Sequence, residues 1–304
     1  MKQRVLALLL ACAMLLSMAG CSSRETPVVD ETPKQEVQTP ASKPEEPKEE
    51  IKQPEVEIEI PELGEKIATL KVQNDDVAGW LKIPDTEIDN AVMHTTNNEF
   101  YLRKDELKQY SWTGCYFADY ECRFGPTAED LGRSTVIYGH NINYDDGKDK
   151  ERFSQLFHFA DEEWAKEHPY IYFSTTEEDM MWEVFAVAYT TKDFNYIQVL
   201  KDRKVSDEQL TEAQMINIVN EARERSEYDY NDVEVDGDDK IITLSTCSYK
   251  YGTNRSDVRF IVMAKLVTED DVLVEKANIT LNTDKKEVQY RKSRLSNQSA
   301  FSLL

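Results

Sequence analysis

Short β-rich runs recur along this chain, and helical segments interrupt them at irregular intervals. The runs cover residues 77–84, 88–93, 114–117, 134–138, 170–173, 182–189, 241–246 and 259–267. A parallel α/β sheet needs strands and helices in regular alternation, which this order lacks. The pattern therefore predicts a mainly β fold, a mixed β-barrel with helical insertions.

Three segments before or between these runs have the features of helices. Apolar residues at helical spacing begin at Leu63, and residues 161–168 form a second candidate that Pro169 ends. Ser206 and Gln209 have the spacing of a capping box, which predicts a third helix over residues 206–225. A further strand is expected around residues 276–281.

The first 21 residues have the organisation of an export signal. Lys2 and Arg4 precede an apolar run over residues 5–16, and small residues then lead to Cys21. The Met-Ala-Gly sequence before Cys21 is similar to a bacterial lipoprotein cleavage box, so Cys21 is expected to carry lipid. Alternatives are an ordinary secretory signal and an uncleaved membrane anchor, although a spanning helix needs about 20 apolar residues. All three place the rest of the chain outside the cytoplasm, and an N-terminal anchor such as a lipidated Cys21 is expected to hold it at the extracytoplasmic face of the membrane.

The remaining chain divides by composition into three parts. Residues 22–61 are rich in Pro, Glu, Lys, Thr and Gln and nearly lack aromatic residues, which predicts a disordered tether. Residues 62–268 contain the β-rich runs and are expected to fold as one domain. Residues 269–304 form a polar C-terminal extension.

Charge and cysteine content exclude several classes of function. The formal net charge of −22 argues against nucleic-acid binding, because phosphate contacts require a basic surface. Asp145 and Asp146 are interpreted as a solvated turn rather than a calcium site. A disulfide between Cys115 and Cys122 stays open, because sequence alone does not establish its geometry. No second close Cys or His pair accompanies them, so no zinc site is predicted.

Cys247 is the candidate nucleophile, because it ends a β-rich run and has no cysteine near it in sequence. An exported protein rarely keeps an unpaired thiol without a reason. His140 follows Gly139 after another run, where glycine is expected to allow a turn that presents the imidazole. Arg259 begins the apolar run at 259–267, and Arg255 is an alternative to it. A thiol, an imidazole and a guanidinium are the groups that thiol-based acyl transfer requires.

The blocks around these three residues resemble the signature blocks of class B sortases. The similar blocks are residues 243–247, 259–265 and 136–141, with further ones at 77–89, 98–102 and 168–172. Together they cover about residues 63–267 and are far more specific than any one block. The resemblance implies an eight-stranded sortase β-barrel with N-terminal helices and a helix before the cysteine-bearing strand. It also implies that residues 62–268 are the catalytic domain.

The resemblance implies a role for each candidate residue. Cys247 is the nucleophile, His140 the general acid/base, and Arg259 the residue that orients the substrate and stabilises the oxyanion. The substrate-binding residues implied in the same way are Asn98, Leu102, Tyr196, Ile197 and Ser245. The segment from Cys247 to Arg259 is slightly longer than usual in the class, which keeps Arg255 as an alternative. Sortases are usually held by a membrane helix, so a signal that ends at Cys21 departs from the family.

The implied activity is cleavage of a C-terminal sorting motif after Thr, through a Cys247 thioester, and transfer of the protein to an amine. Expected partners are surface proteins with such a motif, while a peptidoglycan precursor or a pilin subunit supplies the amine. These bond changes require no cofactor and no metal. Two alternatives are a thiol peptidase or amidase that releases its product to water, and a surface lipoprotein that binds peptides without catalysis.

Overall fold

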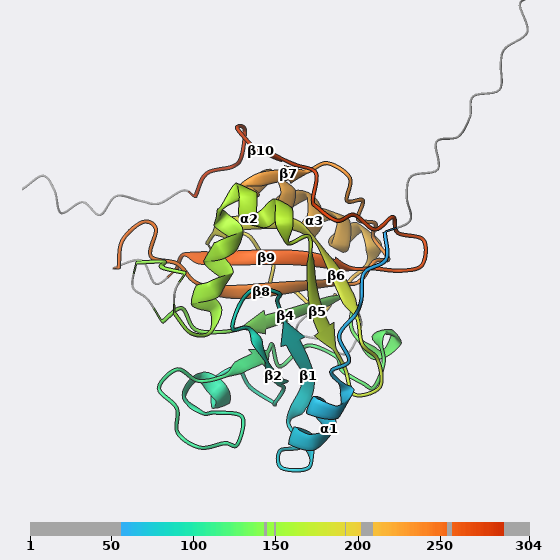
Figure 1. Cartoon of the computed structure of the whole chain (residues 1–304). Coiled ribbons are helices and arrows are strands. Elements are labelled where there is room, and N and C mark those ends of the chain that lie inside the picture. The colour runs from blue at the N-terminus through green and yellow to red at the C-terminus, as the bar shows by residue number, and fades with distance from the viewer. Residues whose placement is uncertain are drawn as a thin grey trace, which may run out of the picture. The chain divides into compact units, whose positions relative to one another are not determined.

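Eight strands close into a barrel in this computed structural model (Figure 1), which describes residues 56–142, 145–148, 150–191, 193–201, 209–253 and 257–288. In chain order the barrel strands are β1 (Val77–Lys82), β2 (Asp89–Met93), β3 (Tyr116–Ala118), β4 (Ser134–Tyr138), β5 (Tyr170–Ser174), β6 (Met181–Thr190), β8 (Ile241–Cys247) and β9 (Arg259–Leu266). Around the barrel their order is β1-β2-β3-β4-β8-β9-β6-β5, and β5 pairs with β1. The mainly β, eight-stranded barrel expected from the sequence is confirmed.

Strand direction determines which strand ends meet. β4 runs parallel to β8, and β2 runs parallel to β3, while the other neighbours are antiparallel. Closing the sheet leaves no unpaired strand edge in the barrel. β6 is buried at all ten of its positions. A helix covers its outer face, and the barrel interior packs against its inner face.

Among the described residues, three α-helices and three short 3-10 helices lie before or between the strands. They are α1 (Gly64–Lys71), α2 (Glu162–Glu167) and α3 (Glu212–Arg225), with η1 (Phe100–Arg103), η2 (Ala128–Asp130) and η3 (Phe153–Ala160). Within the described ranges α1 is the one helix that precedes β1. The predicted helix over residues 161–168 is confirmed as α2, whose N-cap Asp161 accepts a hydrogen bond from the Trp164 backbone N–H at 3.3 Å.

The helix before the cysteine-bearing strand starts later than the sequence predicted. Its N-cap is Thr211, which forms the capping box with Gln214. Gln209 instead accepts a hydrogen bond from the Arg133 backbone N–H at 2.8 Å and lies in a β-bridge with Leu200. The predicted helical start was therefore wrong at Gln209, and Ser206 lies outside the described residues.

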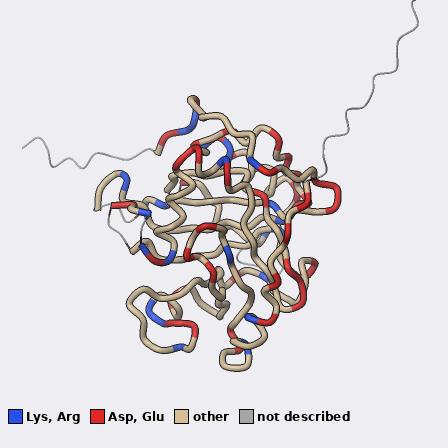
Figure 2. The backbone as a smooth tube through the Cα atoms, viewed as in Figure 1, with Lys and Arg blue, Asp and Glu red and all other residues tan. Residues whose placement is uncertain are grey.

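Residues after the barrel fold back onto it. β10 (Ile279–Leu281) pairs antiparallel with β7 (Tyr228–Tyr230), which confirms the strand predicted around residues 276–281. Ile279 and Val288 are buried in the main hydrophobic core. Acidic residues lie along many of the connecting segments, with basic residues between them (Figure 2).

The predictions for the N-terminal signal and for most of the tether fall on residues 1–55, outside the described part of the chain. None of the helices that the structure describes is both long enough and apolar enough to cross a bilayer.

Candidate active site

The register of the barrel brings Cys247 and Arg259 together. Cys247 is the last residue of β8 and pairs with Arg259, the first residue of β9. Directly paired residues of antiparallel strands have Cβ atoms about 4.5–5.5 Å apart. Both side chains are half-buried, so they remain accessible to a bound molecule. Two residues that are distant along the chain thus form a cross-strand pair at one end of the barrel.

His140 reaches the same end because β4 runs parallel to β8. Tyr138, the last residue of β4, is in register with Ser245. The backbone N–H of Gly139 donates to the Ser245 carbonyl at 3.3 Å, which extends the pairing beyond the strand. His140 follows Tyr138 by the same number of residues as Cys247 follows Ser245. The structure therefore places the three predicted catalytic residues at one end of the barrel, Cys247 and Arg259 on β8 and β9 and His140 two residues beyond the end of the adjacent β4.

Gly139 serves close packing and not a turn, which corrects the prediction from sequence. Its φ is not positive, so any residue could adopt its backbone conformation. A Cβ atom there would lie 2.7 Å from the Phe153 ring and 2.9 Å from the Tyr116 ring. These two rings stack with centroids 4.5 Å apart. The missing side chain lets the backbone before His140 lie directly against this aromatic pair.

The hydrogen bond of His140 determines which ring nitrogen carries its proton. Nε2 lies 2.9 Å from the Leu102 carbonyl oxygen, and a carbonyl can only accept. Nε2 therefore carries hydrogen, and in the neutral ring Nδ1 is the basic nitrogen. Burial lowers the pKa of His140 below its ordinary value of 6.5, and the charges of Arg103 and Arg152 lower it further against the effect of the Leu102 hydrogen bond. The neutral imidazole is thus favoured in the free protein.

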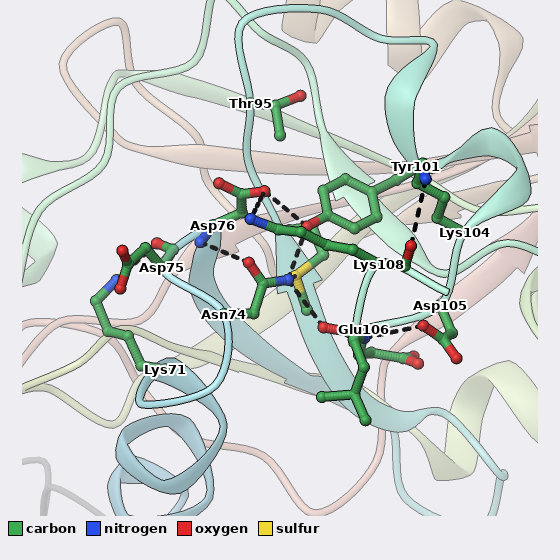
Figure 3. Close-up of polar contacts among 12 residues, drawn as sticks. Lys71, Asn74, Asp75, Asp76, Thr95, Tyr101, Lys104, Asp105, Glu106 and Lys108 are labelled. Carbon is green, nitrogen blue, oxygen red and sulfur yellow. Dashed lines mark hydrogen bonds and ion pairs between the residues drawn. The ribbon is translucent and has the colours of Figure 1, made fainter. Parts of the chain in front are cut away.

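A buried polar cluster holds the Leu102 segment against the barrel (Figure 3). The Asn74 amide donates to the Tyr101 hydroxyl at 2.7 Å and to the Glu106 carbonyl at 2.8 Å. The Tyr101 hydroxyl donates in turn to Asp76 at 2.7 Å. Sequence reasoning placed Leu102 near the substrate groove and missed its contact with His140. A backbone carbonyl is common to all residues, so no residue-type signal could have revealed it.

Arg259 and the predicted groove residue Tyr196 lie near one another. The Arg259 guanidinium donates from Nη1 to the Val258 carbonyl at 2.9 Å. The Tyr196 hydroxyl is hydrogen-bonded to Ser245 Oγ at 3.0 Å. Burial raises the pKa of Tyr196, and the Ser245 hydrogen bond and the positive charge of Arg259 oppose this rise. Arg255, the alternative arginine, lies outside the described residues.

Asn98 is fixed to the barrel wall by a carboxylate that the sequence did not reveal. Its amide donates to Asp119 Oδ2 at 2.9 Å, and its Oδ1 accepts from the Tyr120 backbone N–H at 2.9 Å. Asp119 also accepts from the Tyr138 hydroxyl at 2.9 Å. Asp119 is buried and orients Asn98.

The predicted groove residue Ile197 is half-buried and packs against the hydrophobic core.

The interpretation of residues 145 and 146 as a solvated turn is correct for Asp145 and wrong for Asp146. Asp145 is exposed, and its carboxylate accepts from the Gly147 backbone N–H at 3.2 Å. Asp146 is half-buried and accepts hydrogen bonds from residues 248 and 249, which directly follow Cys247.

The disulfide left open in the sequence does not form. Cys115 and Cys122 are both free and buried, in separate hydrophobic clusters. Among the described residues no group of His, Cys, Asp and Glu side chains is arranged to hold a metal ion.

Comparison with known proteins identifies the family. The model of the sortase domain matches residues 81–267, which include His140, Cys247 and Arg259. The chain belongs to the sortase family. A curated sortase B of Listeria monocytogenes is 32% identical over 205 residues, which cover 67% of this chain and 75% of that protein.

Solved structures of class B sortases share this barrel. Sortase B from Listeria monocytogenes is 30% identical with a TM-score of 0.51, and the match covers 66% of this chain and 99% of that chain. Sortase B from Clostridium perfringens is 26% identical with a TM-score of 0.54, over 66% of this chain and 99% of that one. The resemblance to class B sortases is confirmed, and with it a sortase-type cysteine transpeptidase activity.

Proposed function

We propose that this sortase cleaves a C-terminal sorting motif after Thr and transfers the protein to an amine. The observation that carries the proposal is the register of β4, β8 and β9, which gathers His140, Cys247 and Arg259 at one end of the barrel. Each of the three supplies a group that acyl transfer through a thiol requires.

In the first half-reaction the Cys247 thiolate attacks the carbonyl carbon of the Thr residue. The new carbon–sulfur bond gives a tetrahedral intermediate, whose oxyanion the Arg259 guanidinium stabilises. The carbon–nitrogen bond then breaks, and the departing amine takes a proton from His140. Because Nε2 is bound to the Leu102 carbonyl, Nδ1 is the nitrogen that exchanges this proton.

In the second half-reaction an amine attacks the thioester. The amine belongs to a peptidoglycan precursor or to a lysine of a pilin subunit. His140 accepts the proton that the amine loses, the new amide forms, and Cys247 leaves as a thiolate. The protein substrate thereby becomes covalently attached to the acceptor, and the enzyme returns to its initial state.

Protonation limits the active population of the free enzyme. The mechanism needs His140 as an imidazolium when the amine departs. Burial lowers the pKa of His140 below its ordinary value of 6.5, so the imidazolium is the minor form at neutral pH. The proposal therefore implies slow turnover in the absence of further activation by substrate.

The residues around the nucleophile support binding of an extended peptide. Leu102 is 36% exposed and follows Phe100, which is exposed to the same extent. Tyr196 and Ser245 form a hydrogen-bonded wall beside Cys247. Apolar surface with a few fixed polar groups is typical of ligand sites. We assign the sorting motif to this surface, with Asn98 and Ile197 at its edges.

The experiment is a panel of fluorogenic sorting peptides, incubated with the purified full chain with and without an amine acceptor. We expect cleavage, an acyl-enzyme on Cys247 by mass spectrometry, and an aminolysis product when the acceptor is present. Cys247→Ala should abolish all three. Hydrolysis alone, even at high acceptor concentration, would identify a thiol peptidase instead of a transpeptidase.

The choice of arginine is tested with a matched pair of variants. Arg259→Ala should lower kcat by about 10²–10³-fold, as expected for loss of an oxyanion donor. Arg255→Ala should retain activity close to that of the wild type. The reverse result would move the role to Arg255.

We further propose that Cys21 is lipidated and holds the catalytic domain at the extracytoplasmic face of the membrane. The apolar run at residues 5–16 and the small residues before Cys21 support this proposal. Labelled lipid precursor should be incorporated into the wild type and not into Cys21→Ala. Equal labelling of both would exclude Cys21 as the lipid attachment site.

A further inference from the structure

Asp146 forms hydrogen bonds to the segment that directly follows the nucleophile. Its Oδ2 accepts from the Ser248 hydroxyl at 2.6 Å, and its Oδ1 accepts from the Tyr249 backbone N–H at 2.7 Å. Hydrogen bonds to a carboxylate are roughly twice as strong as those between neutral groups. Asp146 itself lies in the connection after β4, the strand that leads to His140. One carboxylate thus joins the chain after His140 to the chain after Cys247.

Asn141 makes a second connection between the same two segments. One amide hydrogen bond of Asn141 goes to Asp146 Oδ1 at 2.9 Å, and the other goes to the Cys247 carbonyl at 3.0 Å. Its Oδ1 accepts from the Ser154 hydroxyl at 3.0 Å. Ser154 is fully buried, and Asn141 is 8% exposed. The Asn141 amide, directly after His140, therefore donates a hydrogen bond to the backbone carbonyl of Cys247.

These contacts act near the end of the pairing between β8 and β9. β8 ends at Cys247, and one more backbone hydrogen bond continues its pairing with β9. Beyond it, the Ser248 N–H donates to the Val258 carbonyl at 3.1 Å. Asp146 has a φ of +57°, in the left-handed region that Asp tolerates better than most residues other than glycine.

We propose that Asp146 and Asn141 are positioning residues, which clamp the Cys247–Tyr249 backbone to the His140 segment and thereby set the geometry between thiol and imidazole. This inference rests on the proposed catalytic roles of Cys247 and His140. A displacement of about 1 Å between reacting groups can lower a rate about 10²-fold. Pairing with β9 holds the Cys247 segment from one side, and Asp146 and Asn141 hold it from the side of His140.

Substitution of Asp146 by Asn and by Ala distinguishes the effect of its hydrogen bonds from the effect of its negative charge. An Asn side chain can keep Oδ1 as the acceptor for Asn141 and Tyr249 and donate from Nδ2 to the Ser248 hydroxyl. That hydroxyl oxygen is able to accept, as its contact with the Lys250 N–H at 3.2 Å shows. Asp146→Asn should therefore lower kcat only a few-fold. Asp146→Ala removes all three bonds and should lower kcat by about 30–100-fold at little-changed KM.

The matched control is Asp145→Ala, which removes the neighbouring exposed carboxylate and should leave kcat and KM close to the wild-type values. Ser248→Ala removes one of the three bonds and should give an intermediate loss. If the two residues act in one unit, the double variant Asp146→Ala/Ser248→Ala should be no slower than Asp146→Ala alone. Ser248→Ala also provides the test if Asp146→Ala fails to fold.

A readout independent of turnover is the rate of alkylation of Cys247 by iodoacetamide across pH, followed on the full chain by peptide-resolved mass spectrometry. His140→Ala should shift this pH profile, and Asp146→Ala should shift it in the same direction. A shift in His140→Ala without one in Asp146→Ala, or no shift in either, overturns the clamp.

The turnover experiments give three further results that overturn it. They are wild-type kcat in Asp146→Ala, equal losses in Asp146→Asn and Asp146→Ala, and a loss confined to KM. Wild-type protein without peptide turnover would contradict the proposed function, and the alkylation profiles would still test the clamp.

Discussion

Burial lowers the pKa of His140, and the segment that supplies its hydrogen-bond acceptor also carries a charge that affects this pKa. Arg103 follows Leu102, and its positive charge is one of the causes that lower the pKa of His140. Removing this cation should therefore raise the pKa. We expect Arg103→Gln to raise it only slightly, because the arginine is exposed and water screens its charge.

The measurement is an NMR titration of the His140 ring in a Cys247→Ala background, where no thiolate affects the titration. Lys104→Gln is the control, because Lys104 is the adjacent cation and is not among the causes of the shift. A pKa that stays constant or falls in Arg103→Gln would show that the charge of Arg103 does not reach the imidazole.

Residue types indicated the candidate catalytic groups of the site but not the contacts that orient them. Cys247 and His140 could be predicted because a lone thiol and a histidine after a strand are recognisable in sequence. Leu102 acts on His140 through a carbonyl, which every residue has. Asp146 belongs to an acidic pair in a polar stretch, a pattern typical of a solvated turn. Its hydrogen-bond partners Ser248 and Tyr249 lie about a hundred residues away, and only the fold brings them to Asp146.

At the scale of elements, the strands were predicted better than the start of the longest helix. Strand periodicity reflects burial in the barrel, and the run at residues 241–246 corresponds closely to β8. The start of α3 depends on which of two similar polar patterns caps it. Thr211 and Gln214 form the capping box, because the Gln209 side chain bonds to the backbone of Arg133 instead. That competing contact is tertiary, so the local sequence could not reveal it.

The pairing of elements was likewise beyond what sequence patterns indicate. The parallel contact between β4 and β8 joins strands that are separated by about a hundred residues. This contact places His140 beside the cysteine-bearing strand. The resemblance to class B sortases implied that His140 and Cys247 act together, but periodicity identifies strands without specifying their neighbours, so the pairing itself came from the structure.

At the scale of the whole molecule, buried ionisable groups make stability depend on pH in opposite directions. Burial lowers the pKa values of His94 and His140 below 6.5. The unfolded chain therefore binds more protons than the folded protein as the pH falls through about 6.5, and stability is lost. Burial, together with the charge of Asp271, raises the pKa of Glu183 from 4.5 to about 7. The folded protein binds more protons between these two values, so stability is lost as the pH rises through them.

Glu183→Gln should remove the second of these effects. Glu183 on β6 is in register with Lys265 on β9, but the Lys265 ammonium binds Asp271 at 2.7 Å. The free energy of unfolding of the wild type should fall between pH 5 and pH 8.5 by about 1–2 kcal/mol more than that of the variant.

Urea unfolding at both pH values measures this difference, and Glu177→Gln, at an exposed position, is the control. Equal pH slopes in wild type and Glu183→Gln would show that Glu183 is already ionised at pH 5. If Glu177→Gln changed the pH slope of the unfolding free energy by the same amount, the effect would belong to net charge. Only a buried carboxyl is expected to keep its proton in the folded protein at a pH where the unfolded chain has lost it.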